Sequence, residues 1–444
     1  MAGRIDFEFG FGQRPTSSQD QDTETRFYCL ADFSGHTENP AINVIKIDLD
    51  SFDAVMTKFS PSLLFNNQLL VFKTLDDFHP DQILKNQPDL IELQRLKRGL
   101  DNPNTAATIA AEIWQTYQPK ATETTQTETI TDTLDRLLER KSNLNEPNVQ
   151  AKNTVDGLLK NIISPLIIAD TPPEHQALSA FLDAAMTDLL NSILHHPEFQ
   201  ALEASWRALY SLLFDEDEDE NQRFYLIHAK KQNLATDINP IAQALINHGS
   251  KTANSIIIGD YYFADTADDI TLLASLGALA EHLNSRFISA AEPAFIKQRL
   301  NNTEVHPVWQ NLRQSSIAEC IGLCCPRILL RLPYGKKREA IDSFDFEEFN
   351  NGLQHEQLLW GNPAFFFARL LVRENLGYQN SQDIDNLPAL VHLKDDEQRL
   401  YPCSEYFLSE QHINKLLLAG LMPFISFQNR HSVRLLANQS LKAN

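Results

Sequence analysis

The stretch from residue 192 to residue 214, SILHHPEFQALEASWRALYSLLF, is the strongest constraint on the fold of this chain. It predicts one helix that ends, a tight break, and a second helix that begins. His195 and His196 close the first helix, because positive charge suits a helix C-terminus. Pro197 lies in the first turn of the second helix, where a proline is tolerated. Apolar side chains then recur at spacings of three and four, which predicts one buried helix face: Phe199, Leu202, Trp206, Leu209 and Leu213.

The composition is that of an ordinary globular protein. The chain has 444 residues, of which 43% are hydrophobic and 22% charged, enough for two or three domains with sizeable cores. The net charge of -21 argues against nonspecific binding to nucleic acid or anionic membrane, although an acidic face can meet a basic partner.

The lack of a secretory or membrane-spanning pattern and the low cysteine content predict a cytoplasmic protein. No run of 18 apolar residues is present, so we predict no transmembrane helix. The first residues, MAGRIDFEFGFGQR, do not have the pattern of a secretory signal. Five cysteines fit a reducing compartment without a disulfide framework.

The N-terminus predicts an isolated strand with a very apolar face. Residues 4–11 alternate strictly between apolar and other side chains, and the polar run 16–25 separates them from the next apolar segment. Two interpretations stay open: an edge strand of its own domain, or a strand donated to a neighbouring subunit through backbone hydrogen bonds. The four residues that would face the partner are Ile5, Phe7, Phe9 and Phe11.

The first part of the chain predicts a small α/β domain over residues 1–101. Its helices are expected at 50–60, capped by Asp50 or Ser51, and from Asp76 to about residue 100. Further strands are expected at 26–33, 42–49 and 69–75.

Residues 102–150 are expected to be a linker. The segment 120–133 is rich in Thr and Glu and has little to bury. A short helix is expected at about 131–141.

Residues 151–444 predict a larger α/β domain. It opens with helices at about 174–195 and 198–214, and the six acids of 215–220 then form a solvated loop, because the spacing of a calcium loop is absent. Strands alternate with helices at 236–248 and 267–284, which predicts a mostly parallel or mixed sheet flanked by helices. The expected strands are 223–229, 255–259, 287–291, 327–333, 388–394 and 421–427, of which 287–291 and 327–333 have the continuous apolar character of strands buried on both faces.

No catalytic or cofactor motif is present. The sequence contains no GxxxxGK[ST], GxGxxG, GxSxG or HExxH pattern. Asp32, Asp76, Asp77 and Asp260 have no recognisable nucleophile or cofactor loop as a partner. We therefore predict no catalytic residues, no cofactor and no enzymatic activity.

Candidate metal ligands are better explained by packing. His195 and His196 are adjacent, so they point about 100° apart on a regular helix and cannot easily grip one ion. Cys320, Cys324 and Cys325 lack a second ligand pair and have apolar neighbours, which favours small buried residues before a strand. We predict no metal site.

The one basic cluster, residues 335–338, permits two interpretations. It is either a solvated turn or a contact with an acidic neighbour in an assembly.

Several segments resemble one family, the large contractile-sheath subunit of the bacterial type VI secretion system (TssC, or VipB). The resemblance covers about residues 160–380. Its segments are PLIIADTPPEHQAL (165–178), HHPEFQALEASWRALYSLL (195–213), IIIGDYYF (256–263), PRILLRLPYG (326–335), FDFEEF (344–349) and LLWGNPAFFFARLL (358–371).

The first hundred residues resemble the small sheath subunit (TssB, or VipA). The segments that carry this resemblance are LADFSGH (30–36), DSFDAVM (50–56), LDDFHPDQIL (75–84) and LQRLKRGLDNP (93–103). Because the two sheath subunits are related, an N-terminal domain of a divergent large subunit is the alternative.

The resemblance implies a structural protein without catalytic residues. Sheath subunits stack into a helical tube around an inner tube in the cytoplasm, and contraction drives the inner tube out of the cell. The implied partners are small and large sheath subunits, the inner tube protein and the baseplate. The strand Ile5–Phe11 would then be an interlacing element. Large subunits continue past the region that matches 420–427, whereas this chain stops at Asn444, so a non-polymerising accessory of the same apparatus is the alternative.

Overall fold

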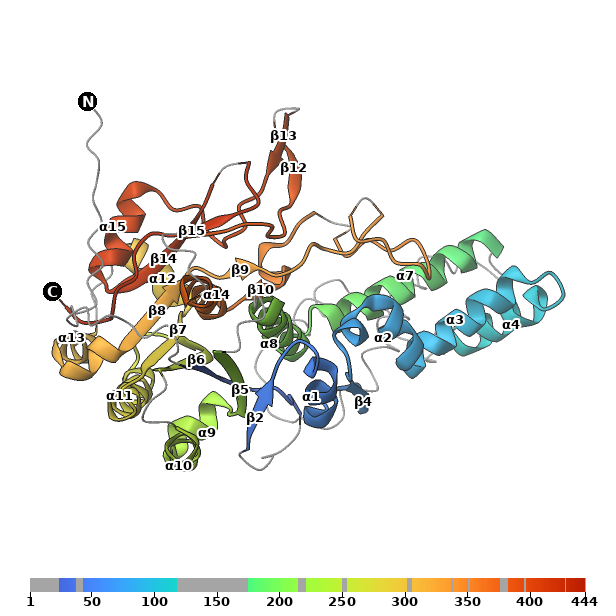
Figure 1. Ribbon diagram of the computed structural model, residues 1–444. Helices are drawn as coiled ribbons and strands as arrows, with labels where there is room; N and C mark the ends of the chain where they lie inside the picture. The colour runs from blue at the N-terminus through green and yellow to red at the C-terminus, as the bar shows by residue number, and fades with distance from the viewer. Residues whose placement is uncertain are drawn as a thin grey trace, which may run out of the picture.

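A nine-stranded mixed sheet organises the molecule, in the order β11-β15-β14-β8-β7-β6-β1-β5-β2 (Figure 1). Six neighbouring strands are parallel: β5 (Gln222–His228), β1 (Thr25–Ala31), β6 (Asn254–Phe263), β7 (Arg286–Ala291), β8 (Ile321–Cys325) and β14 (Leu421–Ser426). The outer strands run antiparallel to their neighbours: β2 (Val44–Ile47), β15 (Val433–Leu435) and β11 (Asp383–Ile384). The predicted α/β class with a mostly parallel, mixed sheet is confirmed.

The computed structural model describes most of the chain. The described residues are 24–36, 43–117, 175–214, 221–249, 254–301, 306–336, 338–349, 352–375, 382–394, 397–427 and 429–443. The predicted strand Ile5–Phe11, the acidic run 215–220, the Thr-rich segment and the expected helix at 131–141 lie outside them.

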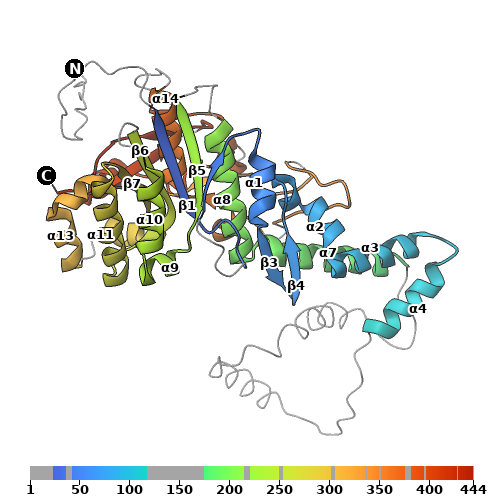
Figure 2. The same ribbon diagram turned by 60° about the horizontal axis from the view of Figure 1, so that its bottom comes forward.

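Helices cover both faces of the sheet because its central strands are apolar on both sides. In β1, Phe27 and Cys29 point into one core and Tyr28 and Leu30 into the other. The first core is covered by α8 (Pro197–Phe214), α14 (Pro363–Asn375) and part of α7 (His175–Leu194). Figure 2 shows α10, α11 and α13 side by side across the other face. The helices of that second face are α9 (Lys231–Thr236), α10 (Asn239–His248), α11 (Ala267–His282), α12 (Pro293–Leu300), α13 (Pro307–Gln314) and α15 (Glu410–Leu418).

Two strands from the first fifty residues belong to the main sheet. β1 lies between β5 and β6, and β2 pairs with the other side of β5. The predicted division between 1–101 and 151–444 therefore does not appear in the sheet. The reason is the burial of β1 on both faces, which requires a strand on each side and a helix layer above and below.

Prolines divide the helix that is expected from Asp76 to residue 100. The chain forms η1 (Leu75–Phe78), α2 (Pro80–Asn86) and α3 (Pro88–Asp101), with a proline in the first turn of each α-helix. A proline has no N–H to continue the preceding helix, so each one starts a new segment.

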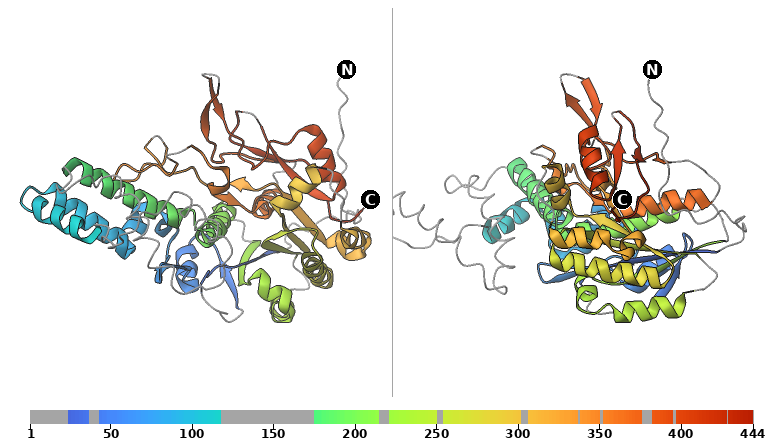
Figure 3. Two further views of the ribbon diagram at one scale, coloured as in Figure 1. Left: turned by 180° about the vertical axis from the view of Figure 1, so that it is seen from behind. Right: turned by 90° about the vertical axis from the view of Figure 1, so that its left-hand side faces the viewer.

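The expected linker begins with a helix. α4 (Ala106–Tyr117) lies within the predicted linker 102–150 and buries Ile109 and Ile113. Figure 3 shows α3, α4 and α7 extending together as an arm from the sheet. The linker prediction is wrong for this helix, because the two isoleucines sit four residues apart and need a partner face.

A hairpin replaces the single strand that is expected at 69–75. Its strands are β3 (Ser62–Phe65) and β4 (Gln68–Val71), joined by Asn66 and Asn67, which both have positive φ angles. Two positive φ angles are the geometry of a type I′ turn, and Asn tolerates it. A second hairpin pairs β12 (Val391–Lys394) with β13 (Glu397–Leu400).

The strand expected at 327–333 is not part of the main sheet, because the preceding segment forms the strand there. β8 (Ile321–Cys325) takes the place in the main sheet, whereas β9 (Ile328–Leu329) lies outside it, where it pairs with β10 (Trp360–Gly361) and forms one bridge to Ser404. Pro326 follows β8 directly and cannot donate a ladder hydrogen bond, so the chain leaves the sheet there.

Helix α7 is, among the described residues, the one helix whose length and composition would allow it to cross a membrane. More than half of that apolar stretch is buried inside the protein, where it packs with α3. Core packing accounts for its apolar character.

Candidate functional site

The parallel strands point to one place where a ligand would be expected. Along the chain they come in the order β1, β5, β6, β7 and β8, but in the sheet β1 stands between β5 and β6. The direction of the connections therefore reverses at β1, and open α/β sheets bind ligands at the carboxyl ends of the strands beside such a reversal.

Helix α8 fills that position with side chains. The Trp206 indole N–H donates a hydrogen bond to the Phe33 carbonyl oxygen at 3.1 Å, just after β1 ends. Rings of Phe33, Phe52 and Phe59 surround the indole at centroid distances of 5.2, 5.6 and 6.0 Å. Trp206 has no exposed surface. Aromatic packing thus occupies the place where an α/β enzyme would hold its ligand.

All five side chains expected on the buried face of this helix are buried: Phe199, Leu202, Trp206, Leu209 and Leu213. Phe199 contacts the rings of Phe72 and Phe78, each at a centroid distance of 5.6 Å. The face therefore joins α8 to segments from the first hundred residues.

Asp260 ties the same helix to β6. The Ser205 hydroxyl donates to Oδ2 of Asp260 at 2.5 Å. Desolvation raises the pKa of this carboxyl to about 6, against the opposing effect of that hydrogen bond. The contact joins a strand to the helix above it.

The other singled-out carboxylates accept hydrogen bonds from nearby backbone groups. Asp77 accepts hydrogen bonds from the backbone N–H groups of Lys73 and Thr74 and belongs to a capping box at η1, in whose first turn Asp76 also lies. Asp32 accepts from the Gly35 N–H at 2.9 Å. The structure brings Asp32 and Asp260 to the same end of the sheet but leaves Asp76 and Asp77 elsewhere.

Asp32, Ser34 and His228 form a set with the residue types of a hydrolase triad but without its geometry. The Ser34 hydroxyl lies 3.1 Å from Nδ1 and 3.4 Å from Nε2 of His228, and Oδ1 of Asp32 lies 3.8 Å from Nδ1. In a catalytic triad the serine bonds to the ring nitrogen opposite the carboxylate, whereas Ser34 lies closer to the nitrogen that faces Asp32. Ser34 is also only 1% exposed, so a substrate could not reach its hydroxyl.

The most distinctive polar feature is a buried charge network that sequence patterns did not reveal. It consists of His195, Glu203, Arg207, Arg331, Tyr334 and Glu348. Glu203 and Arg207 lie on α8, and the others come from the end of α7 and from the loops that follow β9.

Arg331 is the centre of this buried charge network. Its guanidinium contacts Oε1 of Glu203 at 3.0 Å and Oε2 of Glu348 at 2.9 Å, and it lies over the ring of Tyr334 at 4.4 Å. Arg331 is 7% exposed and Glu203 is fully buried. Desolvation opposes the charge on Arg331, but the two carboxylates outweigh it and raise its pKa further.

The second carboxylate of the network is held from three directions. Glu348 accepts from the Tyr334 N–H at 2.8 Å, and its Oε1 lies 3.3 Å from Nε2 of His195. Desolvation would raise the pKa of Glu348, but Arg331 and the hydrogen bonds keep that pKa below its usual value. His195, which the sequence placed at a helix end, therefore pairs with a carboxylate and stacks on Phe349.

Only one sequence signal could have indicated the network. Glu203 and Arg207 stand four residues apart on a helix, a spacing that lets their side chains meet. Arg331 and Glu348 are distant in the sequence from that pair, and no local pattern connects them to it.

Hydrogen bonds from the loop before Glu348 converge on Asp81 of α2, and we call these contacts the Asp81 clamp. Asp81 accepts hydrogen bonds from the backbone N–H groups of Asp342 and Ser343 at 3.0 and 3.1 Å and from the Ser343 hydroxyl at 2.6 Å. Three donors converge on one carboxylate, which fixes this loop against the N-terminal part of the chain.

Replacing Asp81 by alanine is expected to lower the free energy of unfolding by about 1–3 kcal/mol, because partly buried donors lose their acceptor. Urea unfolding at neutral pH measures the change. Asp345→Ala is the matched control in the same loop, since Asp345 is 88% exposed and its ion pair with Lys336 should contribute under about 1 kcal/mol. Equal losses in both variants would contradict the clamp.

A bidentate ion pair fixes the segment after β13 to the end of β8. Arg327 donates to both carboxylate oxygens of Glu405, at 2.9 and 2.8 Å. Desolvation would raise the pKa of Glu405, but the hydrogen bonds and charge of Arg327 outweigh it and lower the pKa to about 2.

This pair predicts a pH-dependent stability. Because the folded-state pKa of Glu405 is below the usual 4.5, the carboxylate stabilises the fold fully above about pH 4.5 and progressively less as pH falls toward 2. The lost contribution is about 3 kcal/mol. Unfolding of wild type and Glu405→Gln should differ most at pH 7 and converge near pH 2. A difference that stays constant over this range would refute the assignment.

The cysteines are packed as small core residues. Cys324 and Cys325 are buried as expected, but they lie within the strand β8 and not before a strand, and they point into opposite cores. Burial raises the pKa of both thiols above the usual range, which disfavours the thiolate that binds a metal. Within the described residues no three His, Cys, Asp or Glu side chains gather as a metal site.

Lys336 of the basic turn is paired within the chain. Lys336 lies 3.3 Å from Oδ2 of Asp345, and its backbone N–H donates to Glu347 at 3.0 Å. Lys336 thus has acidic partners within the chain.

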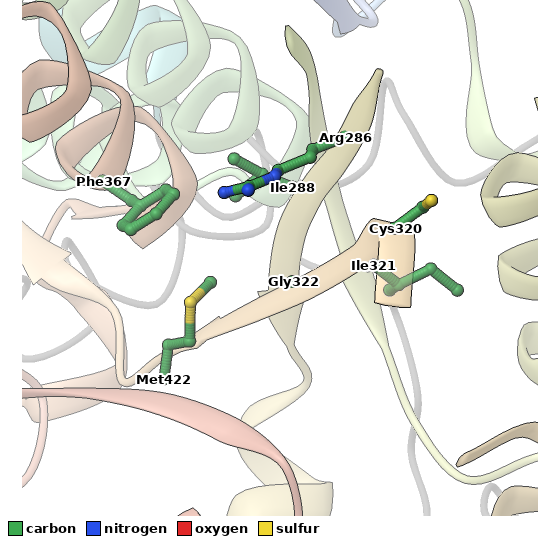
Figure 4. Close-up of a pocket in the computed structure, with 7 residues that line it drawn as sticks. All are labelled: Arg286, Ile288, Cys320, Ile321, Gly322, Phe367 and Met422. Atoms are coloured by element: carbon green, nitrogen blue, oxygen red, sulfur yellow. The ribbon is translucent and has the colours of Figure 1, made fainter. Parts of the chain in front are cut away.

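A small cavity lies between β7, β8, β14 and α14. Figure 4 shows Phe367 and Met422 around it, with Ile288 and Gly322 from the two central strands. Its volume of about 10 Å³ holds roughly one water molecule. Cofactor pockets measure about 300–1,000 Å³, so this cavity is a packing gap.

Comparison with known proteins gives one consistent result. Residues 176–442 match the family described as EvpB/VC_A0108, tail sheath N-terminal domain (VipB). Residues 15–135 match the family described as type VI secretion system, VipA, VC_A0107 or Hcp2. The chain is 29% identical over 314 residues to the type VI secretion system sheath protein TssC1 of Pseudomonas aeruginosa PAO1.

The similarity to TssC1 covers 62% of this chain and 63% of that protein, so the alignment spans less than two thirds of the relative. The VipB match covers more than half of the chain and includes α8 and every residue of the buried charge network. This family is one of structural sheath proteins, not a known enzyme family. The chain therefore belongs to the tail sheath family of the type VI secretion system.

Proposed function

We propose that this protein is a structural subunit of a type VI contractile sheath, which assembles in the cytoplasm around an inner tube and contracts to drive that tube outward. One observation carries the proposal. Trp206 of α8 and the rings of Phe33 and Phe52 fill the position at which α/β enzymes bind ligands, and α8 lies inside the residues that match the tail sheath family.

A sheath subunit works through packing instead of chemistry. Repeated head-to-tail contacts between copies generate open helical assemblies. A subunit that transmits force through such contacts must resist deformation, and the buried charge network joins the end of α7, α8 and the long segment after β9. We further propose the other sheath subunits, the inner tube protein and the baseplate as partners.

The test of this function is microscopy of the purified full chain, alone and together with the proteins encoded beside it. Tubes or rings in negative stain would support a sheath subunit. Small discrete complexes under all conditions would contradict it and favour a non-polymerising accessory. Turnover of a bound small molecule would overturn the structural assignment altogether.

The N-terminal residues are proposed to donate a strand to a neighbouring subunit. The alternating apolar side chains of Ile5–Phe11 would pair with a sheet edge of the next copy through backbone hydrogen bonds. Their apolar face would then be buried on assembly.

Deleting residues 1–14 is expected to abolish assembly and to leave the subunit folded, because a donated strand pairs with the next copy and not with its own sheet. Microscopy reads assembly and circular dichroism reads stability. The matched pair of variants is Phe7→Ser with Phe9→Ser against Asp6→Ser with Glu8→Ser, which alters the opposite face. Normal assembly by the deletion variant would exclude strand donation.

A further inference from the structure

Two parts of the chain match two different sheath families, and the structure shows how they meet. We call residues 24–36 and 43–117 the N-terminal part, which lies within or beside the VipA match, and the described residues from 175 onward the C-terminal part, which carries the VipB match. β1 of the N-terminal part pairs in parallel along its whole length with β5, from Thr25 opposite Gln222 to Ala31 opposite His228. Its other edge pairs with β6.

The C-terminal part cannot complete this sheet without the N-terminal part. β5 has two neighbours in the sheet, β1 on one side and β2 on the other, and both belong to the N-terminal part. Removing the N-terminal part would separate β5 from β6 and leave unpaired backbone groups on both edges of β5 and on one edge of β6.

Side-chain contacts extend this interface beyond the sheet. Trp206 donates to the Phe33 carbonyl, Phe199 packs on Phe78, and an ion pair joins Lys97 to Asp183. The side chains of both parts belong to one continuous hydrophobic core. Such burial is typical of obligate interfaces, which resemble a domain core cut in two.

We infer that this protein is a two-part sheath protomer within one polypeptide: its N-terminal part occupies, in the same chain, the position that a separate small sheath subunit would fill, and no separate small subunit binds there. That the displaced partner is a small sheath subunit rests on the proposed sheath function. That the N-terminal part completes the sheet around β5 does not depend on it. Covalent connection fixes the two parts at equal amounts and makes their association intramolecular.

The test uses the full chain with a protease recognition sequence inserted within residues 118–174. After folding and purification the chain is cleaved there and passed over a gel-filtration column. We expect both fragments to elute together at the volume of the uncleaved protein and to separate only in denaturant. Separation of the fragments under native conditions would overturn the inference.

An exchange experiment examines the same position directly. Two cleaved preparations, which carry different tags on their N-terminal fragments and different tags on their C-terminal fragments, are mixed for a day. We expect each N-terminal tag to recover only its original partner, because β1 is held on both edges. Extensive exchange would show that a separate small subunit could enter. The two readouts do not require polymerisation, so their failure is distinguishable from failure of the proposed function.

A pair of variants reports on β1 itself. Leu30→Asn places a polar group at a fully buried position of β1, whereas Ile91→Asn alters a side chain of α3 that is 44% exposed. After cleavage the first variant should exchange or separate, and the second should behave as wild type. If Leu30→Asn does not fold, the cleaved wild-type protein still decides the question.

Discussion

Replacing Arg331 by alanine is expected to lower the free energy of unfolding by about 3–5 kcal/mol, because the substitution leaves buried carboxylates without their countercharge. Glu203 would keep Arg207 at 2.7 Å, but Glu348 would retain only His195 and the Tyr334 N–H. Urea unfolding at pH 7 measures this loss.

The pH dependence distinguishes the charge effect from lost packing. In the variant, Glu348 no longer gains from Arg331, so its folded-state pKa should rise and protonation should relieve the destabilisation as pH falls. The deficit of Arg331→Ala relative to wild type should therefore shrink between pH 7 and pH 4. A deficit that does not change with pH would assign the loss to packing alone.

Lys336→Ala is the matched control for this charge effect. Lys336 belongs to an ion pair in a neighbouring loop, and its side chain is 72% exposed. Exposed pairs contribute little, so the expected loss is under about 1 kcal/mol. A loss for Arg331→Ala that is no larger than that of the control would show that the network does not stabilise the fold.

Replacing Trp206 by alanine is expected to cost about 3–5 kcal/mol, since a large buried side chain is lost and a cavity remains. The Phe33 carbonyl would also lose its donor. The cost should appear as a lower denaturation midpoint in urea and as a lower melting temperature. A near-neutral result would mean that this position is not part of the core.

One further variant separates the ring of Trp206 from its N–H donor, and another serves as a surface control. Trp206→Phe keeps an aromatic ring among Phe33, Phe52 and Phe59 but removes the N–H donor, so it should cost less than the alanine variant. Ile246→Ala, at a side chain that is 44% exposed, should change stability by no more than about 0.5 kcal/mol. Equal effects of Trp206→Ala and Ile246→Ala would contradict the role of Trp206.

Local patterns predict the helices around residue 196 well. Pro197 and the spacing of Phe199, Leu202 and Trp206 describe a helix start and one apolar face, and α8 begins at Pro197 with those side chains buried. Apolar periodicity alone is misleading at 76–100, because Pro80 and Pro88 each start a new helix there.

Strands are harder to predict from sequence than these helices, because two neighbouring apolar segments can each fit the same position in a sheet. Both 321–325 and 327–333 are apolar, and periodicity does not choose between them. The structure places Ile321–Cys325 beside β7, with Pro326 ending the strand.

The α/β class, the packing helix around Trp206 and the absence of known catalytic motifs can all be read from the sequence alone, because each depends on residues that are close along the chain. The position of β1 between β5 and β6, and the meeting of Arg331 with Glu203 and Glu348, became apparent only in the folded molecule. These are contacts between distant segments. Their energies depend on burial and on which strand edges and charges remain to be paired after every other element has packed, and no local spacing records that outcome.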